Sequence, residues 1–297
     1  MISQEKARDV ILDTASFLST EKVEVLAGYG RASSENILAG FNHPKWEKSA
    51  MDGYSFQAAD TRKASQESPI RLKLIKTLTA GSSAISEINP GEAVRIMTGA
   101  VLPPGTDTVV PLEEANVKNG FVEIENPITV GECVRKAGDE VCEGSRILGR
   151  GEEIRATHIE SLTLMGRTHL EVGRRPLVAI FSTGDEVIEP EDHRIDGGAL
   201  GYGQFYCSIN YYMAALVMEA GGGPLRLGVA KDTLEATVER ILASKNADAV
   251  IITGGTGKGD NDLVGPAMTD AGVHEVFKNV RIWPGTYTAF GLLDTSL

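Results

Sequence analysis

The sequence predicts an α/β fold interrupted by a β-rich inserted domain, and two patterns support this class. From Arg175 onward, short apolar runs alternate with helical segments, which is typical of a parallel sheet covered on both faces. Between Ser55 and about Thr129, apolar residues recur with period two instead, which is typical of strands with one buried face. The 297 residues are enough for two or three domains, each with its own core.

The individual elements follow from the same periodicities. Apolar residues at helical spacing predict an amphipathic helix over residues 4–19. Alternation in the β-rich part predicts a strand around 70–74 and another at 121–124, after a Lys-Asn-Gly turn. In the last part we expect three parallel strands and two helices, namely strands 177–181, 225–229 and 249–252 and helices near 206–220 and 233–244. Two final strands, at 273–277 and 288–293, are expected to extend the same sheet.

Changes of periodicity near residues 46, 136 and 175 predict the domain boundaries. They divide the chain into the segments 1–45, 46–136, 137–174 and 175–297. The chain ends at Leu297, directly after an apolar strand and without a closing helix. We therefore expect a truncation or a missing domain.

Composition excludes several classes of protein. With 41 acidic against 29 basic residues the formal charge is -12, so no basic surface for nucleic acid is expected. The sequence lacks both the run of about 18 apolar residues that a membrane helix needs and the hydrophobic centre of a signal peptide. We therefore expect a cytoplasmic protein without a membrane partner. Its three cysteines are too few for a disulfide framework and lack the spacing of a structural zinc site.

Two loops that follow predicted buried strands could carry chemistry. The glycines of residues 253–262 let backbone N–H groups approach a phosphate, ahead of a helix predicted to start near Asp262. The spacing does not match a Walker A loop, and the alternative is a plain turn in which Asp262 caps the helix. The loop at 182–186 would bring further carboxylates to the same sheet edge, where they suit Mg²⁺. The alternative there is an acidic pair that caps a helix.

Six segments together resemble one known family. They are Ser-Ala-Met-Asp-Gly-Tyr (49–54), Ile-Met-Thr-Gly-Ala (96–100) with Pro-Pro-Gly (103–105), Ser-Thr-Gly-Asp-Glu (182–186), Gly-Gln-Phe-Tyr (203–206), the Gly-rich loop ending in Asp262, and Pro-Gly (284–285) followed by Ala-Phe-Gly (289–291). On composition alone we interpret the first two as turns. All six occur in the order in which the molybdopterin molybdenumtransferase family carries them. The sequence is identified as a member of this family, whose relatives include the C-terminal part of gephyrin.

The resemblance implies an elongated homodimer with a three-layer, molybdopterin-binding α/β domain. In it, 1–45 and 137–174 are two parts of a linker domain, 46–136 is a β-rich lid domain, and 175–297 is the α/β domain, without the family's C-terminal β domain. The implied reaction takes adenylylated molybdopterin and molybdate, uses Mg²⁺ or a similar divalent cation, and yields molybdenum cofactor and AMP. Molybdopterin adenylyltransferase is a candidate partner.

The resemblance also implies which residues form the site. It implies catalytic roles for Asp52, Thr98, Arg135, Glu140, Glu186 and Asp262, of which Glu186 and Asp262 would hold the metal. It implies substrate binding by Thr183, Gly184, Asp185, Ser208, Gly254, Gly255, Thr256, Gly257, Lys258, Pro284 and Gly285. Thr98 and Arg135 can donate hydrogen bonds to molybdate oxygens. In the family, lid and α/β residues of one site belong to different subunits.

Departures from the family pattern leave three hypotheses open. Cys207, Ile209 and Asn210 stand where the family usually has an acidic group, an amide and a cation, and we expect Cys207 to pack as a small buried residue. Thr286 replaces a lysine, and a lost charge-assisted hydrogen bond costs about 1.5–3 kcal/mol unless Lys258 compensates. The chain is an active transferase, a non-catalytic paralogue that binds molybdopterin or molybdate as carrier, sensor or scaffold, or a decayed fragment.

Overall fold

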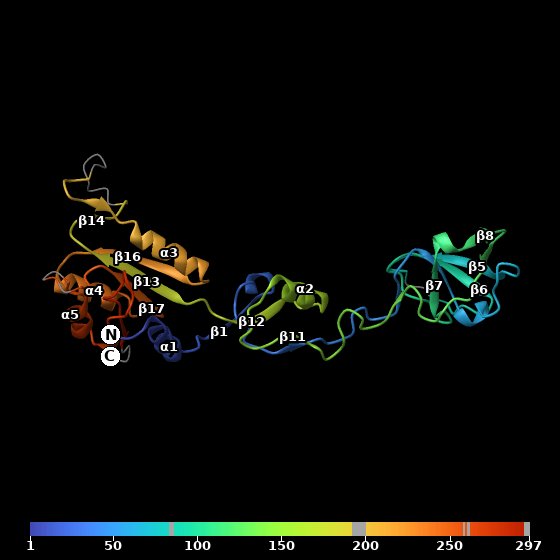
Figure 1. The fold of residues 1–297 in the computed structure, drawn as a ribbon, viewed down its shortest axis with the longest axis horizontal. Coiled ribbons are helices and arrows are strands. Elements are labelled where there is room, and N and C mark those ends of the chain that lie inside the picture. Colours follow the sequence, from blue (N-terminus) through green and yellow to red (C-terminus); the bar gives the residue numbers. More distant parts are fainter. Residues whose placement is uncertain (83–85, 192–199, 258, 260–261, 294–297) are drawn as a thin grey trace. The chain divides into compact units, whose positions relative to one another are not determined.

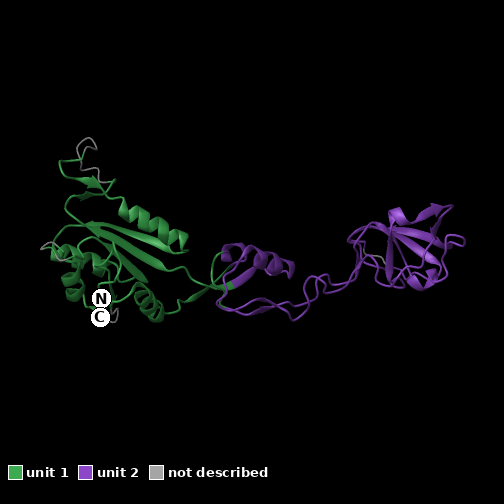
Figure 2. Cartoon of the chain, in the orientation of Figure 1, with its two compact units in different colours: residues 1–23, 30–34, 171–297 green, residues 24–29, 35–170 purple. Residues whose placement is uncertain are grey.

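The computed structural model describes residues 1–82, 86–191, 200–257, 259 and 262–293. The chain divides into two compact units (Figure 1, Figure 2). Unit 1 comprises residues 1–23, 30–34 and 171–297, and unit 2 comprises residues 24–29 and 35–170. Most of unit 2 is therefore a single long insertion into the chain of unit 1. No helix in these described ranges is long and apolar enough to cross a membrane.

A six-stranded sheet forms the β-rich part of unit 2. In spatial order its strands are β7 (Thr108–Pro111), β4 (Gly53–Phe56), β6 (Glu92–Ile96), β5 (Ile70–Leu78), β9 (Phe121–Ile124) and β8 (Asn116–Lys118). The strand predicted at 121–124 is confirmed, and the one predicted around 70–74 extends to Leu78. The hairpin turn also forms as expected, with Asn119 and Gly120 at φ 50° and 80°, the positive values that a two-residue turn requires.

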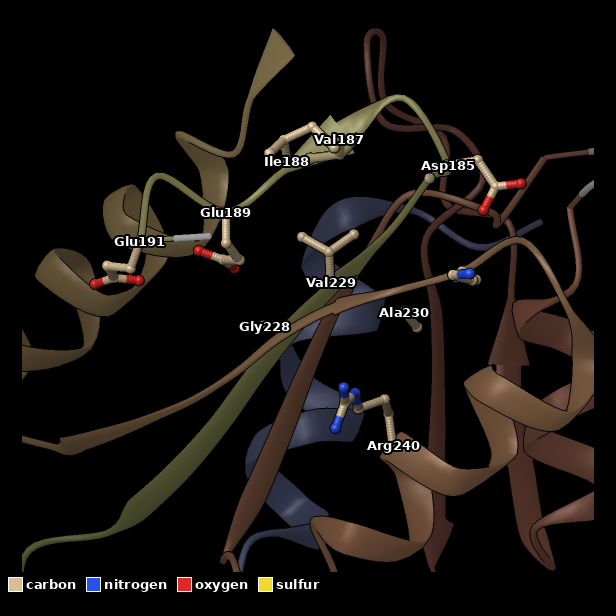
Figure 3. A pocket seen from close by; sticks show the side chains of 11 residues that line it. Asp185, Val187, Ile188, Glu189, Glu191, Gly228, Val229, Ala230 and Arg240 are labelled. Carbon is tan, nitrogen blue, oxygen red and sulfur yellow. The ribbon is translucent and has the colours of Figure 1, made fainter. Parts of the chain in front are cut away.

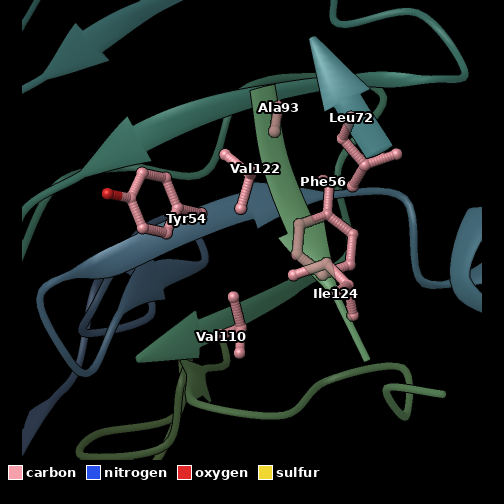
Figure 4. Close-up of a cluster of buried hydrophobic side chains, with 7 residues drawn as sticks. All are labelled: Tyr54, Phe56, Leu72, Ala93, Val110, Val122 and Ile124. Atoms are coloured by element: carbon pink, nitrogen blue, oxygen red, sulfur yellow. The ribbon is translucent and has the colours of Figure 1, made fainter. Parts of the chain in front are cut away.

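The core of unit 2 follows from the alternation of side chains along these strands. Leu72 is 1% exposed, whereas its neighbours Arg71 and Lys73 are exposed, because successive side chains point to opposite faces. The buried cluster consists of Tyr54, Phe56, Leu72, Ala93, Val110, Val122 and Ile124 (Figure 4). Burial of a side chain such as Phe56, which is 0% exposed, stabilises the fold by about 1.5–3 kcal/mol.

Short elements make up the rest of unit 2 and the passage between the units. The strand β2 (Ile37–Leu38) pairs with β11 (Arg146–Leu148), β3 (Lys48–Ser49) pairs with β10 (Val134–Arg135), and β1 (Thr20–Glu24) pairs with β12 (His169–Gly173). The helical elements are η1 (Leu26–Gly28), η2 (Ala58–Thr61), η3 (Leu112–Glu114) and α2 (Ala156–Leu164). The β3–β10 pair places Arg135 directly opposite Lys48.

Unit 1 contains the predicted parallel sheet, in the order β16 (Gly223–Ala230), β13 (Leu177–Thr183) and β17 (Ala249–Thr253). Val178 and Ile180 pack against α3 (Ile209–Glu219) on one face. Phe181 packs on the other face against α4 (Leu234–Ala243) and α5 (Val264–Asp270). The expected three-layer arrangement, with helices on both faces, is confirmed.

Two expectations for unit 1 are wrong. The strands β18 (Val273–Lys278) and β19 (Ala289–Leu293) do not extend the parallel sheet but form an antiparallel pair of their own. The connection between them is a direct return of the chain, whereas a parallel neighbour would need a crossover. The first helix, α1 (Gln4–Thr14), ends before residue 19 because Ala15 adopts an extended conformation. Its buried Ala7 packs with Phe277 and Val280.

Candidate functional site

Two predicted site residues of unit 2, Asp52 and Thr98, contact each other directly. The Thr98 backbone N–H and the Thr98 hydroxyl both donate to Asp52 Oδ1, each at 2.7 Å. These two donors hold the pKa of Asp52 below its ordinary value of 3.8, with a smaller contribution from Arg95. The loops at 49–54 and 96–100 therefore meet at one ionised, solvent-exposed carboxylate. Each loop also contains a bend or turn, as its composition indicates.

The backbone around this pair explains the residue types in both loops. Gly53 lies in β4 between two neighbouring strands, and a Cβ there would lie 2.0 Å from the Val110 carbonyl oxygen. The Ser49 carbonyl accepts a hydrogen bond from the Gly99 N–H at 2.8 Å, and the Ser49 hydroxyl donates to the Met51 carbonyl at 2.5 Å. Gly99 has φ 80°, which side chains other than glycine rarely adopt. These contacts hold Asp52 opposite Thr98.

We expect Thr98→Val to raise the pKa of Asp52, because valine keeps the backbone donor but loses the hydroxyl donor. In the wild type, the lowered pKa contributes stability that is present above pH 3.8 and is lost as the pH falls through the lower folded-state value. NMR titration of the Asp52 carboxyl carbon measures the change. Thr106→Val is the matched control, since the Thr106 hydroxyl donates to the Pro103 carbonyl. An unchanged Asp52 titration in Thr98→Val would contradict the assignment.

Arg135 and Glu140 are also in contact, within a larger cluster of charges. Arg135 Nη1 lies 3.3 Å and Lys48 Nζ 3.4 Å from Glu140 Oε1, and His43 Nε2 lies 3.3 Å from Glu140 Oε2. Sequence reasoning missed Lys48 and His43, because their positions depend on the register of β3 with β10 and on a bridge between His43 and Val141. No hydrogen bond or ion pair among the described residues joins this cluster to Asp52.

In unit 1, the loops that follow β13 and β17 meet at one edge of the sheet, as predicted. Ser182 pairs with Thr253 in the parallel ladder, so both strands end side by side. A Cβ at Gly254 or at Gly255 would lie 2.9 Å from Thr183 Oγ1. Both glycines also have positive φ, at 90° and 56°. The two loops therefore fit together only because these positions lack side chains.

Asp262 does not cap the helix that follows it, so the alternative of a plain turn with Asp262 as the cap is wrong. The helix α5 begins at Val264, and Leu263 occupies the N-cap position. Asp262 Oδ2 instead accepts the Gly259 N–H at 2.5 Å. A Cβ at Gly257 would lie 2.7 Å from the same oxygen, so the carboxylate lies against the loop that contains Thr256 and Gly257. Lys258 lies outside the described residues.

The acidic loop after β13 has a partner that the sequence analysis did not identify. The Asp185 N–H donates to Asp232 Oδ2 at 3.4 Å, and the Asp232 N–H donates to Asp185 Oδ1 at 3.3 Å. Asp232 follows β16, so the strand-end argument used for β13 and β17 could have found it. The Glu186 carbonyl accepts the Phe205 N–H at 3.0 Å, and its side chain is exposed. Within the described ranges, no hydrogen bond joins Glu186 to Asp262.

Two residues that depart from the family pattern, Cys207 and Thr286, make their side-chain contacts within unit 1. Cys207 is 1% exposed and its Sγ lies 3.4 Å from Ser182 Oγ, which confirms the expected packing. Ser208 is exposed and precedes α3 without capping it through its side chain. The Thr286 hydroxyl donates to the Ile282 carbonyl at 2.7 Å, within the exposed turn that holds Pro284 and Gly285. No hydrogen bond in the described part of the chain joins this turn to residues 253–257.

A cleft of about 400 Å³ opens beside the loop after β13 (Figure 3). Its lining residues are Gly184, Asp185, Val187, Ile188, Glu189, Glu191, Gly228, Val229, Ala230, Lys231 and Arg240. They come from the β13 loop, from β14 (Val187–Ile188), which pairs with β15 (Phe205–Tyr206), from the end of β16 and from α4. Glu189 and Glu191 lie at one end of the cleft, Asp185 lies at the other end, and the Arg240 side chain lies apart from these carboxylates (Figure 3). The cleft suits a small molecule with both polar and charged groups.

The donor set of unit 1 fits Mg²⁺ by type. Glu186 and Asp262 supply carboxylate oxygens, and Mg²⁺ usually takes one or two carboxylates while water and substrate phosphate complete its shell. Across the described ranges, no group of three or more His, Cys, Asp or Glu side chains is placed to hold a metal ion. The described carboxylates alone therefore do not assemble a metal site.

Comparison with known proteins places the chain in a family. Residues 2–166 match the family described as MoeA N-terminal region (domain I and II), and residues 179–295 match the probable molybdopterin binding domain. The chain belongs to the MoeA family. A MoeA crystal structure from Pyrococcus horikosii, titled as a molybdopterin biosynthesis protein, aligns with a TM-score of 0.84 and 30% identity, over 99% of this chain and 73% of that one.

Curated relatives of this MoeA family member carry the name molybdopterin molybdenumtransferase. The protein from Nostoc sp. is 35% identical over 90% of this chain and 60% of its own length. The protein from Bacillus subtilis is 32% identical over 91% of this chain and 62% of its own length. The chain thus spans less than two thirds of the length of these relatives.

Proposed function

We propose that this MoeA family member acts in molybdenum cofactor biosynthesis, inserting molybdenum from molybdate into adenylylated molybdopterin with release of AMP. The observation that carries the proposal is the Asp52–Thr98 pair, in which two separate motifs converge through two 2.7 Å hydrogen bonds. The meeting of Thr183 with Gly254 and Gly255 supports it, because that sheet edge is where an anionic ligand binds in open α/β folds.

The residues suggest distinct roles in this reaction. Backbone N–H groups of Gly254 to Gly257 would hold the phosphate or diphosphate of the pterin substrate. Arg135 would donate hydrogen bonds to molybdate oxygens, whereas the one proton of the Thr98 hydroxyl is already donated to Asp52. Asp52 is a weak base because its pKa is lowered, so it is suited to accepting hydrogen bonds as an anion. Mg²⁺ bound by Glu186 and Asp262 would supply positive charge opposite the departing AMP.

The proposal includes a cytoplasmic homodimer, in which Asp52 and Thr98 of one copy complete the site of Glu186 and Asp262 of the other. It rests on the family resemblance. A molybdopterin adenylyltransferase would supply the adenylylated substrate. Neither nucleic acid nor a membrane is part of the proposal.

A second function, binding without turnover, is favoured by the departures from the family pattern. Cys207 is buried against Ser182 and offers no acidic group there. The Thr286 hydroxyl is engaged within its own turn, so it does not replace the positive charge of the family's lysine. A carrier, sensor or scaffold of molybdopterin or molybdate would retain binding and lack AMP release.

One assay separates the two functions. The purified chain is given adenylylated molybdopterin, molybdate and Mg²⁺, and AMP is quantified by chromatography. Molybdate-dependent AMP release that is lost in Glu186→Ala supports the transferase. Binding of either ligand by calorimetry without AMP release supports the binding paralogue. Aggregation of the wild type, with neither activity nor binding, would favour the decayed fragment.

A further inference from the structure

Two like charges face each other across the β3–β10 pair of unit 2. The register places Arg135 directly opposite Lys48, and like charges in this position repel. Glu140 Oε1 offsets the repulsion, at 3.3 Å from Arg135 Nη1 and 3.4 Å from Lys48 Nζ. His43 Nε2 holds the second carboxylate oxygen at 3.3 Å. One carboxylate therefore lies among three side chains that can carry positive charge.

This arrangement leaves an excess of positive charge in a chain whose formal charge is -12. Lys48 and Arg135 are both cationic, whereas Glu140 contributes a single negative charge. The side chains of Arg135 and Glu140 are 55% and 38% exposed. Ion pairs this exposed contribute little to stability, so stability alone does not account for two cations held side by side. Their positions suit an anion from solution.

We propose that Lys48 and Arg135 form a clamp for a tetrahedral oxyanion, with Glu140 as the resident counter-ion that keeps the two cations in register. The planar guanidinium of Arg135 suits two oxygens of such an anion, and the ammonium of Lys48 supplies a compact charge beside it. His43 is a positioning residue that fixes Glu140 from the other side. The identity of the anion rests on the proposed function, since molybdate and a phosphoryl group share this chemistry.

Equilibrium dialysis of the full chain against molybdate tests the clamp, with inorganic phosphate and AMP in parallel arms. Lys48→Gln is expected to weaken oxyanion binding about tenfold, because it loses one charge-assisted hydrogen bond. Lys48→Arg is expected to restore binding. Glu140→Gln is expected to strengthen binding by a similar factor, since it removes the negative charge between the cations. Lys45→Gln is the matched control, because Lys45 Nζ lies over the Trp46 ring, 5.1 Å from its centroid.

The clamp predicts changes of opposite sign in the affinity for the anion in Lys48→Gln and Glu140→Gln. Weaker binding in Lys48→Gln with tighter binding in Glu140→Gln supports the clamp, and the arm with the tighter binding identifies molybdate or a phosphoryl group. If both variants bind the anion with the affinity of the wild type and only their melting temperatures change, the clamp proposal is wrong. A fall in both variants also overturns it, because binding would then require the Glu140 carboxylate instead of competing with it.

The same measurements separate this inference from the proposed function. If the chain binds molybdate in a way that depends on Lys48 but releases no AMP, the clamp is supported and the transferase function is contradicted. If the chain releases AMP and Lys48→Gln does not change the KM for molybdate, the clamp is contradicted and the transferase function is supported. In an active enzyme with the clamp, Lys48→Gln raises the KM for molybdate about tenfold while kcat changes little.

Discussion

The variant Asp262→Ala is expected to release AMP at least about a hundredfold more slowly than the wild type. In the proposed reaction this carboxylate would hold Mg²⁺, and its loss would remove several kcal/mol of charge stabilisation. The carboxylate lies against the Gly-rich loop, where Asp262 Oδ2 accepts the Gly259 N–H. Gly259 is exposed, so water can satisfy its N–H in the variant and the melting temperature should change little. Single-turnover AMP release at saturating Mg²⁺ measures the effect.

Two further variants identify the cause of such a loss. Asp262→Asn keeps an oxygen that can accept the Gly259 N–H but carries no charge, so it should be as inactive as Asp262→Ala if charge matters. Full activity in Asp262→Asn would show that only the loop conformation is needed. Asp270→Ala, at the exposed end of α5, is the matched acidic control and should keep wild-type AMP release.

The variant Gly53→Ala is expected to destabilise the sheet of unit 2 by about 3 kcal/mol or more, at the upper end of the cost of overpacking. Its Cβ would lie 2.0 Å from the Val110 carbonyl oxygen and 3.0 Å from a Val109 methyl group. Both residues belong to β7, which is hydrogen-bonded to β4, so neither can move without breaking the pair. Urea denaturation followed by circular dichroism measures the loss.

Gly40→Ala is the matched control for this substitution. No heavy atom lies within 4 Å of a Cβ at Gly40, and its φ is not positive. The control should leave stability unchanged or raise it slightly, because alanine restricts the unfolded chain. A Gly53→Ala chain with the denaturation midpoint of the wild type would contradict the close approach of β4 to β7.

The periodicity of the sequence predicts the strands of both units better than it predicts their partners. Leu72 and its exposed neighbours reveal a half-buried strand, and the apolar run that contains Phe181 reveals a buried one. Phe277 and Phe290 lie in equally apolar runs, but such runs look alike in parallel and antiparallel sheets. The helix α5 begins at Val264, close to the start predicted near Asp262, but the Asp262 side chain bonds to a nearby backbone N–H instead of capping the helix.

Some contacts of the candidate site can likewise be predicted from the sequence, and others cannot. The strand-end argument predicts that Thr183 and Gly254 meet, because it depends only on the direction of two strands. The Asp52–Thr98 pair could be expected only from the family resemblance, since the composition of both loops indicates turns. Lys48 and His43 gave no signal in the sequence, because their approach to Glu140 depends on pairing between segments far apart in the chain.

The insertion of unit 2 into unit 1 sets an order of events during synthesis. The helix α1 leaves the ribosome long before Phe277 and Val280, the residues that bury its Ala7. Unit 2, in contrast, is nearly continuous in sequence and can fold while unit 1 is still being translated. Closure of unit 1 must bring together two segments that are far apart in the sequence, and such long-range contacts form slowly. Until then, α1 carries an unpartnered apolar face that chaperones can recognise.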